Sequence, residues 1–220
     1  MIYNYMMANP IIDKEEILKE LKNIGITQDN LVSVYLFGSK YWGYANEESD
    51  INLYVITKKD IGIKQLDLEK ISFRYISTLE ETTEAVIKGS WARFYVLKYA
   101  SKLLIGKEVS LPDYPKEKAV EYLNAKKEDI EKIPIAPLKW GYLTLMAHIF
   151  LINYFFYKSI NFSLDSYKEC RLLNNEEQEF ISKLKKSLFN HKDVSLVQKE
   201  KIVRIIEKID KYIIGNIRKV

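Results

Sequence analysis

The chain has 220 residues, of which 47% are hydrophobic and 29% are charged, and its formal net charge is +4. This length suffices for one large domain or two small ones, and the apolar content excludes an intrinsically disordered chain. A single cysteine, Cys170, excludes an internal disulfide and any metal site built from several cysteines.

The basic excess lies in the second half of the chain. Residues 1–112 carry 14 basic and 15 acidic side chains, whereas residues 113–220 carry 20 and 15. This bias suits a polyanionic substrate or nucleic acid, or else it is a lysine-rich solvated surface. No motif of interleaved aromatic and basic residues accompanies it, so nucleic acid is not the expected partner. The first ten residues lack a basic start followed by a long apolar core, which predicts a cytoplasmic protein.

The first predicted elements are a helix over residues 13–23 and a strand over residues 31–37. Asp13 stands three residues before Glu16 in the pattern of a capping box, and apolar residues follow at helical spacing until Gly25. In the strand, apolar residues recur at every second position.

A turn between two strands carries the most distinctive pattern of the sequence. The first strand ends at Gly38 and Ser39, and a second strand over residues 51–56 follows Asp50. Gly38 lets the backbone approach a ligand closely, and Ser39 can begin a helix whose free N–H groups attract anions. Asp50 and Asn52 share one face because side chains alternate with period two. The pattern predicts a phosphate-binding turn opposite a pair of metal-binding oxygens.

A third strand is predicted over residues 71–77, where the residues again alternate in character. Arg74 shares a face with Ser72 in this strand, where it either touches phosphate or sits at a sheet edge. A long helix is then predicted over residues 80–104 from apolar residues at helical spacing, with Gly89 as the point that could divide it.

The next stretch is a boundary followed by an intensely apolar segment. Four of the five prolines lie within residues 112–137, and a charged helix is expected there over residues 116–131. Polar residues interrupt the apolar run over residues 138–157, which favours a buried helix over a membrane span. His148 in this run is either a hydrogen-bonded core histidine or a substrate contact.

Two further helices are predicted near the end of the chain. Asn175 and Ser195 each stand three residues before a glutamine, as helix caps do. The isoleucines of the last helix recur at the spacing of a core-facing stripe, namely Ile202, Ile206, Ile209, Ile213 and Ile217. These features predict a helical bundle.

The turn and second strand resemble the signature of the DNA polymerase β-like nucleotidyltransferase superfamily: Gly-Ser, ten residues, then Asp-x-Asp. The matching residues are Gly38, Ser39, Gly43, Ala45, Ser49, Asp50 and Ile51. In that family the Gly-Ser pair binds the triphosphate and the two aspartates hold two Mg²⁺ ions that bridge it. The resemblance therefore implies that Asp50 and Asn52 are catalytic and metal-binding residues, with Asn52 in place of the second aspartate.

The resemblance also implies the architecture. It predicts an α+β (mixed α/β) fold with a small nucleotidyltransferase-type sheet flanked by helices, followed by an all-helical bundle. The predicted parts are a nucleotidyltransferase-like domain over residues 1–112, a proline-bracketed linker over residues 113–137 and the bundle over residues 138–220. In layout the bundle resembles the substrate-side domain of antibiotic nucleotidyltransferases.

Further site residues follow from the same resemblance. The candidate nucleotide-binding residues are Gly38, Ser39, Lys40, Trp42 and Arg74. Trp42 belongs to an aromatic cluster that either stacks on a base or packs around the turn. The third carboxylate that the family usually places on its third strand is absent there. Among the acids that flank the strand, Asp67, Glu69, Glu80, Glu81 and Glu84, we select Glu69 as a catalytic candidate.

Two functions agree with this sequence. The first is a Mg²⁺-dependent nucleotidyltransferase that moves a nucleoside monophosphate from an NTP to a hydroxyl acceptor, preferably a small molecule. The alternative is a catalytically weak or silent nucleotide-binding or regulatory module of the same fold. Asn52 brings no charge, which should weaken a second Mg²⁺ more than the ion bound to the nucleotide. Three explanations of Asn52 stay open. The protein is a slow enzyme that takes its second acid from elsewhere in the chain, a catalytically silent nucleotide-binding relative, or a competent enzyme with an engineered change from aspartate to asparagine. No membrane partner is expected, and a homodimer is a further expectation.

Overall fold

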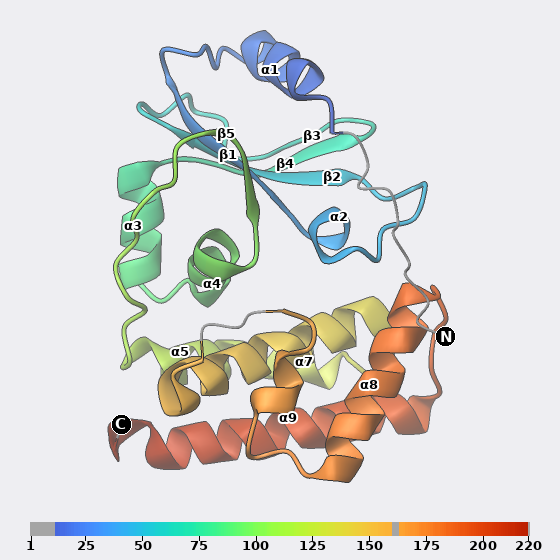
Figure 1. Ribbon diagram of the computed structural model, residues 1–220. Helices are drawn as coiled ribbons and strands as arrows, with labels where there is room; N and C mark the ends of the chain where they lie inside the picture. The colour runs from blue at the N-terminus through green and yellow to red at the C-terminus, as the bar shows by residue number, and fades with distance from the viewer. Residues whose placement is uncertain (1–11, 160–162, 220) are drawn as a thin grey trace. The chain divides into compact units, whose positions relative to one another are not determined.

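The computed structural model describes residues 12–159 and 163–219. It divides into two compact units, one built around a sheet and one built from helices (Figure 1). The sheet unit takes in the chain up to Glu84 and then Val96–Leu111, whereas the helical unit takes in Ala85–Tyr95 and the chain from Pro112 onward. The domain boundaries expected from the sequence stay predictions.

The sheet unit contains a mixed five-stranded sheet in the order β3-β4-β2-β1-β5. Its strands are β1 (Leu31–Phe37), β2 (Ile51–Thr57), β3 (Leu66–Asp67), β4 (Ile71–Thr78) and β5 (Lys102–Gly106). β2 and β4 run parallel, and the other neighbouring pairs run antiparallel. The α+β fold class predicted from the sequence is confirmed, and so are the three predicted strands.

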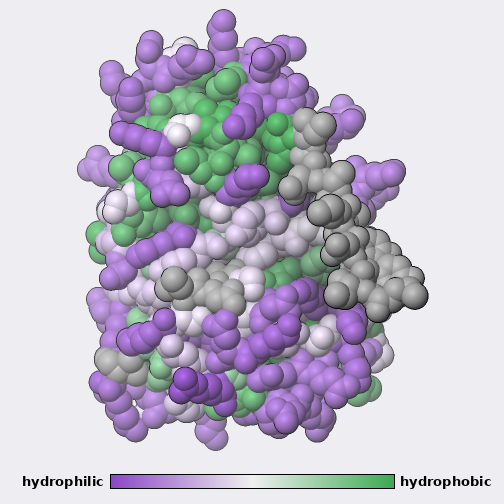
Figure 2. Space-filling model, in the orientation of Figure 1, coloured by the Kyte–Doolittle hydropathy of each residue, from purple (hydrophilic) through white to green (hydrophobic). Residues whose placement is uncertain are grey.

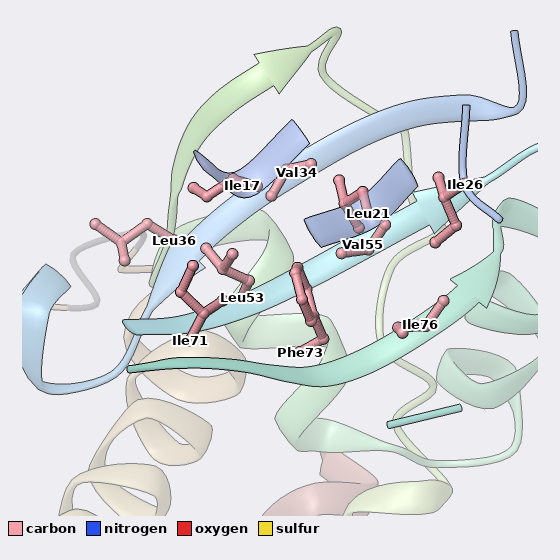
Figure 3. Packing of buried hydrophobic residues seen from close by; sticks show 10 residues of the cluster. All are labelled: Ile17, Leu21, Ile26, Val34, Leu36, Leu53, Val55, Ile71, Phe73 and Ile76. Atoms are coloured by element: carbon pink, nitrogen blue, oxygen red, sulfur yellow. The ribbon is translucent and has the colours of Figure 1, made fainter. Parts of the chain in front are cut away.

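One face of the sheet packs against α1 (Lys14–Asn23) through a buried apolar core (Figure 3). Asp13 caps this helix by accepting hydrogen bonds from the backbone N–H groups of Glu15 and Glu16. Alternate residues of β1, β2 and β4 meet the helix in this core, namely Val34, Leu36, Leu53, Val55, Ile71, Phe73 and Ile76, together with Ile17, Leu21 and Ile26. The residues between them on each strand must therefore face away from α1.

The long helix predicted over residues 80–104 is replaced by two helices and a strand. These are α3 (Leu79–Ile87), α4 (Trp91–Tyr99) and β5. The division at Gly89 is confirmed, because this residue has a φ of 104°, which ends a right-handed helix. The prediction that the last part of this segment is helical is wrong, because the apolar residues of β5 form ladder hydrogen bonds with β1 instead.

The helical unit is built mainly from five helices among the described residues. They are α5 (Lys118–Ala125), α6 (Lys127–Glu131), α7 (Leu138–Ile152), α8 (Asn175–Phe189) and α9 (Leu196–Asn216). The single helix predicted over residues 116–131 is thus two short helices that meet at Lys126. A π-helical turn, Asn153–Tyr157, continues α7, and short 3₁₀ segments span Ser166–Glu169 and Ile217–Lys219.

α7 is the buried helix that the apolar run predicts, and most of its residues are inaccessible to solvent. Within the described parts of the chain, no helix is long and apolar enough to cross a membrane. The predicted isoleucine stripe of α9 is buried as well. On the face drawn in Figure 2, polar residues cover most of the helical unit, in the lower part of the view. This is the expected surface for helices that turn an apolar stripe inward.

The cap predicted for α9 is confirmed, whereas the cap of α8 lies one residue before the predicted position. Ser195 and Gln198 form the predicted capping box of α9. The cap of α8 is Asn174 instead of Asn175, because Asn174 stands three residues before Glu177 and the two exchange hydrogen bonds at 2.9 Å. The reciprocal pair of bonds decides which asparagine begins the helix.

His148 on α7 is a core residue of the helical unit. Its ring is fully buried, and Nδ1 lies 2.7 Å from the carbonyl oxygen of Thr144. Nε2 lies 3.6 Å from Oδ1 of Asp210 on α9, which is too far for a hydrogen bond. Burial lowers the pKa of His148 to about 4, whereas burial and the nearby Glu207 charge raise the pKa of Asp210 to about 7. Between these two pH values both side chains are neutral.

Asp210→Asn should make the protein more stable at pH 8 and leave it unchanged near pH 4. The unfolded chain releases the Asp210 proton near the ordinary pKa of 3.8, whereas the folded protein holds it to about pH 7. The free energy of unfolding therefore falls as pH rises through this window. The gain at pH 8 is at most about 4 kcal/mol, since one pKa unit corresponds to about 1.4 kcal/mol.

Urea unfolding at pH 4, 6 and 8 measures this difference. The matched control is Asp129→Asn on α6, which removes the same charge from a carboxylate that pairs with Lys126 at 2.6 Å. The control should show no gain at pH 8. Equal pH profiles for Asp210→Asn and the unmodified protein would contradict the assignment of the buried proton to Asp210.

Candidate active site

β1 ends in a tight turn that leads into the single-turn helix α2 (Ser39–Trp42). Gly38 has φ 77° and ψ −152°, a conformation that is essentially confined to glycine. A Cβ at this position would lie 3.2 Å from Nδ2 of Asn52, so the turn packs directly against β2. Ser39 is 3% exposed, and its Oγ has no hydrogen-bond partner among the described residues. A buried hydroxyl of this kind costs free energy that a ligand oxygen would recover.

Asp50 and Asn52 lie side by side at the start of β2, as the alternation of strand residues predicts. Nδ2 of Asn52 donates a hydrogen bond of 3.1 Å to Oδ1 of Asp50. Both side chains are half-buried. The structure thus brings together the glycine of the predicted phosphate-binding turn and the predicted metal-binding pair.

Arg74 on β4 joins this group through its guanidinium. Nε donates to Oδ1 of Asn52 at 2.9 Å, and Nη2 lies 3.2 Å from Oδ2 of Asp50. Nη1 lies 3.4 Å from Oδ1 of Asp67 on β3. One planar cation therefore contacts three residues that each offer an oxygen.

Asp67 is held in place by its neighbours on the sheet. It accepts hydrogen bonds from the hydroxyl of Ser72 and from Nε2 of Gln65. These two hydrogen bonds, together with the charge of Arg74, lower the pKa of Asp67. Asp67 therefore stays ionised and acceptor-only at neutral pH.

The register of the strands explains why these side chains converge. Asn52 pairs with Ser72 across the parallel ladder, and Ser72 pairs with Asp67 across the antiparallel one. Paired residues project to the same face of a sheet, so the three form a row. The ladder between β2 and β4 then shifts by one residue, which leaves Arg74 as the extra residue of a bulge. Bulges commonly redirect a side chain beside a functional site.

The other predicted site residues lie at or near the same turn. Lys40 is half-buried on α2. Trp42 is also half-buried, and its ring centroid lies 4.8 Å from that of Tyr41 in an edge-on contact. Their roles in nucleotide binding stay predictions.

Glu69 is exposed in the turn between β3 and β4, and its catalytic role stays a prediction. The acid that the structure joins to the group is Asp67. The sequence places both acids just before the third predicted strand. It carries no signal for the two-residue strand β3, which sets Asp67 opposite Ser72.

Residues 19–109 match the polymerase beta nucleotidyltransferase family. This part of the chain is similar to the DNA polymerase β-like nucleotidyltransferase domains. The matched segment contains every candidate site residue, from Gly38 to Arg74. The resemblance inferred from the Gly-Ser and Asp-x-Asn pattern is confirmed.

Among solved structures, the chain is similar to spectinomycin adenyltransferase AAD(9) from Enterococcus faecialis, a structure determined with ATP and spectinomycin. The TM-score is 0.50, the sequence identity is 15%, and the match covers 91% of this chain and 99% of that one. At this identity the likeness shows the fold, and it extends the match beyond the nucleotidyltransferase domain into the helical unit. No curated protein sequence matches the chain.

The nucleotidyltransferase site fits one Mg²⁺ better than two. Asp50 and Asn52 offer oxygens, the ligands that Mg²⁺ prefers, but only Asp50 carries charge. Their oxygens already accept hydrogen bonds from Arg74 and from the Asn52 amide. In the described part of the chain, no three His, Cys, Asp or Glu side chains are grouped to hold a metal. The neutral Asn52 cannot offset the repulsion between two dications, so the two-ion arrangement does not fit these residues.

Gly38→Ala should destabilise the protein more than Gly43→Ala, although both glycines have a positive φ. Gly43 has φ 79° and ψ 20°, and a Cβ there would meet no atom within 4 Å. Its replacement should cost about 1–2 kcal/mol, the usual cost of a left-handed residue. Gly38→Ala forces an alanine into a backbone conformation confined to glycine and brings its Cβ against Asn52. The total loss of stability should be about 3 kcal/mol.

The free energies of unfolding in urea measure the two losses. Asn52→Ala should relieve part of the loss when combined with Gly38→Ala, because it removes the amide that the new Cβ meets. Equal losses at the two glycines, with no relief in the double variant, would show that the turn does not press on Asn52.

Proposed function

We propose that this protein transfers a nucleoside monophosphate from an NTP to a hydroxyl group of a small molecule, in a Mg²⁺-dependent reaction. The observation that carries the proposal is the unpartnered Ser39 hydroxyl in a turn that packs on the Asp50–Asn52 pair. A buried hydroxyl donor beside a carboxylate and a carboxamide oxygen is suited to a ligand that combines phosphate with a bound cation. An NTP with Mg²⁺ is such a ligand.

The chemistry assigns a role to each side chain. Gly38 lets the phosphates approach the backbone, and the Ser39 hydroxyl donates to a phosphate oxygen. Lys40 and Arg74 supply positive charge to the same region. The acceptor hydroxyl attacks the α-phosphorus and loses its proton to solvent water, a new P–O bond forms, and the bond to the leaving pyrophosphate breaks.

Asp50 would hold Mg²⁺, and the carbonyl oxygen of Asn52 would assist it. When bound, the ion would withdraw charge from the phosphate oxygens. Asp50, the residue before β2, would also orient the attacking hydroxyl. Trp42 offers an aromatic surface for the base.

The small-molecule acceptor is supported by the architecture. Spectinomycin adenyltransferase, which has a similar fold, was determined with a small antibiotic and ATP. The helical unit that accompanies the nucleotidyltransferase domain is where we expect the acceptor to be recognised. The identity of the acceptor, a cytoplasmic location and a homodimer belong to the same proposal.

A second candidate is a silent nucleotide-binding or regulatory module. It is favoured by the neutral Asn52 and by the ion pair between Arg74 and Asp50, which occupies an oxygen that catalysis would use. Both candidates require that the Ser39 turn binds nucleotide. They differ in whether pyrophosphate is released.

Ser39→Ala should weaken the binding of ATP roughly tenfold or more, because it removes one hydrogen bond to a charged phosphate worth about 1.5–3 kcal/mol. The nucleotide-free protein should be as stable as before or slightly more stable, since the lost hydroxyl has no partner. Calorimetric titration with ATP and Mg²⁺ measures the affinity, and thermal unfolding measures the stability.

The control for this change is Ser187→Ala on α8 in the helical unit, which deletes the same atom from a half-buried serine outside the site. Its ATP affinity should not change. Unaltered ATP affinity in folded Ser39→Ala would remove the turn from the nucleotide site and overturn both candidate functions.

Asn52→Asp should increase Mg²⁺-dependent pyrophosphate release from ATP, by about tenfold if one added charge strengthens the hold on the nucleotide-bound ion. Asn52→Ala is the matched control, and it should not show this gain. A coupled pyrophosphate assay measures both variants beside the unmodified protein. A folded Asn52→Asp protein that binds ATP but releases no pyrophosphate would favour the silent module.

A further inference from the structure

The guanidinium of Arg74 lies among the oxygens of the predicted metal-binding pair, Asp50 and Asn52, and of Asp67. Its three nitrogens contact three different residues, Asn52, Asp50 and Asp67, at 2.9, 3.2 and 3.4 Å. These residues come from β2, the turn that precedes it and β3. Convergence of three oxygen-bearing residues on one cation is the arrangement of a cation site, with an arginine in the place of the ion.

The sheet holds Arg74 in this position. As the extra residue of the bulge, it projects to the same face as the next residue, Tyr75. Tyr75 is fixed on that face by stacking on Tyr54 at 4.9 Å and on Phe37 at 6.0 Å between ring centroids. The backbone on one side of Arg74 is thus anchored by aromatic packing, and the guanidinium end is anchored by Asp67.

The charges favour one metal ion over two. Asp50 and Asp67 are the acids that contact the guanidinium, and Asn52 between them is neutral. Arginine stays protonated at any physiological pH, so it balances one of the two carboxylates permanently. A second dication placed among the same oxygens would meet this fixed charge at a few ångströms and would lack a bridging carboxylate.

We propose that Arg74 replaces one of the two metal ions, so that the site carries a built-in cation and excludes a second Mg²⁺ from Asp50, Asn52 and Asp67. Its part in catalysis, where the guanidinium would face the phosphates, rests on the proposed nucleotidyl transfer. The exclusion of the ion is a property of the nucleotide-free protein and is tested there.

The experiment titrates Mn²⁺, a paramagnetic ion that takes the same oxygen ligands as Mg²⁺, into the nucleotide-free protein. Electron paramagnetic resonance reports the free ion, since its signal is lost on binding. Arg74→Gln removes the charge, and Arg74→Lys keeps it. The matched control is Arg204→Gln, at an exposed position of α9. Arg74→Gln should bind Mn²⁺ at least about tenfold more tightly than the unmodified protein, whereas the other two variants should not.

A second measurement covers the case in which Arg74→Gln folds poorly, because that variant leaves two carboxylates without their cation. Mn²⁺ should then raise its melting temperature by more than that of the unmodified protein. Unchanged Mn²⁺ affinity together with no thermal rescue in Arg74→Gln would overturn the proposal. Binding of two Mn²⁺ ions at this site by the unmodified protein would overturn it as well. Neither result depends on ATP binding, so a failure here is distinct from a failure of the proposed function.

Discussion

The packing of α1 against one face of the sheet is the constraint on which the candidate site depends. Burial of Ile17 and Leu21 against the apolar residues of β1, β2 and β4 fixes which strand residues point inward. Because side chains alternate, the same burial forces Asn52 and Ser72 to the other face. A shift of one residue would exchange the core with the site. The hydrophobic core therefore sets the direction of the polar residues of the candidate site.

The electrostatic balance of the site differs from the one that the family resemblance implies. Where the resemblance implies two acids and two dications, this chain has Asp50, the neutral Asn52 and a guanidinium that reaches Asp67 on the next strand. Arginine differs from a metal ion because it is held covalently, carries a single charge and cannot polarise a bound water. In the proposed reaction, the rate of such a site would depend on how much phosphate charge one Mg²⁺ and one guanidinium together offset.

Buried polar groups without a hydrogen-bond partner occur in two different settings in the described part of this protein. The Ser39 hydroxyl lies in a turn at the end of a strand, where a ligand oxygen can complete its hydrogen bond. Nε2 of His148 and Oδ1 of Asp210 are also unpartnered among the described residues, but they face each other at 3.6 Å inside the helical unit. Between about pH 4 and pH 7 the pKa shifts keep both groups neutral. Neither group then buries an unpaired charge.

The sequence by itself determined the local structure and the family. Helical spacing, strand alternation and the caps at Asp13 and Ser195 depend on neighbours a few residues apart, and the Gly38-Ser39 pattern predicted the similarity to nucleotidyltransferase domains that the family match confirms. Tertiary structure decided what depends on distant partners. β5 became a strand because β1 was available to pair with it, and Asp67 joined the site because β3 pairs with β4. The position of Arg74 depends on a bulge in the ladder between β2 and β4. Register, pairing and bulges are set by contacts between segments, and no short window of sequence contains both partners.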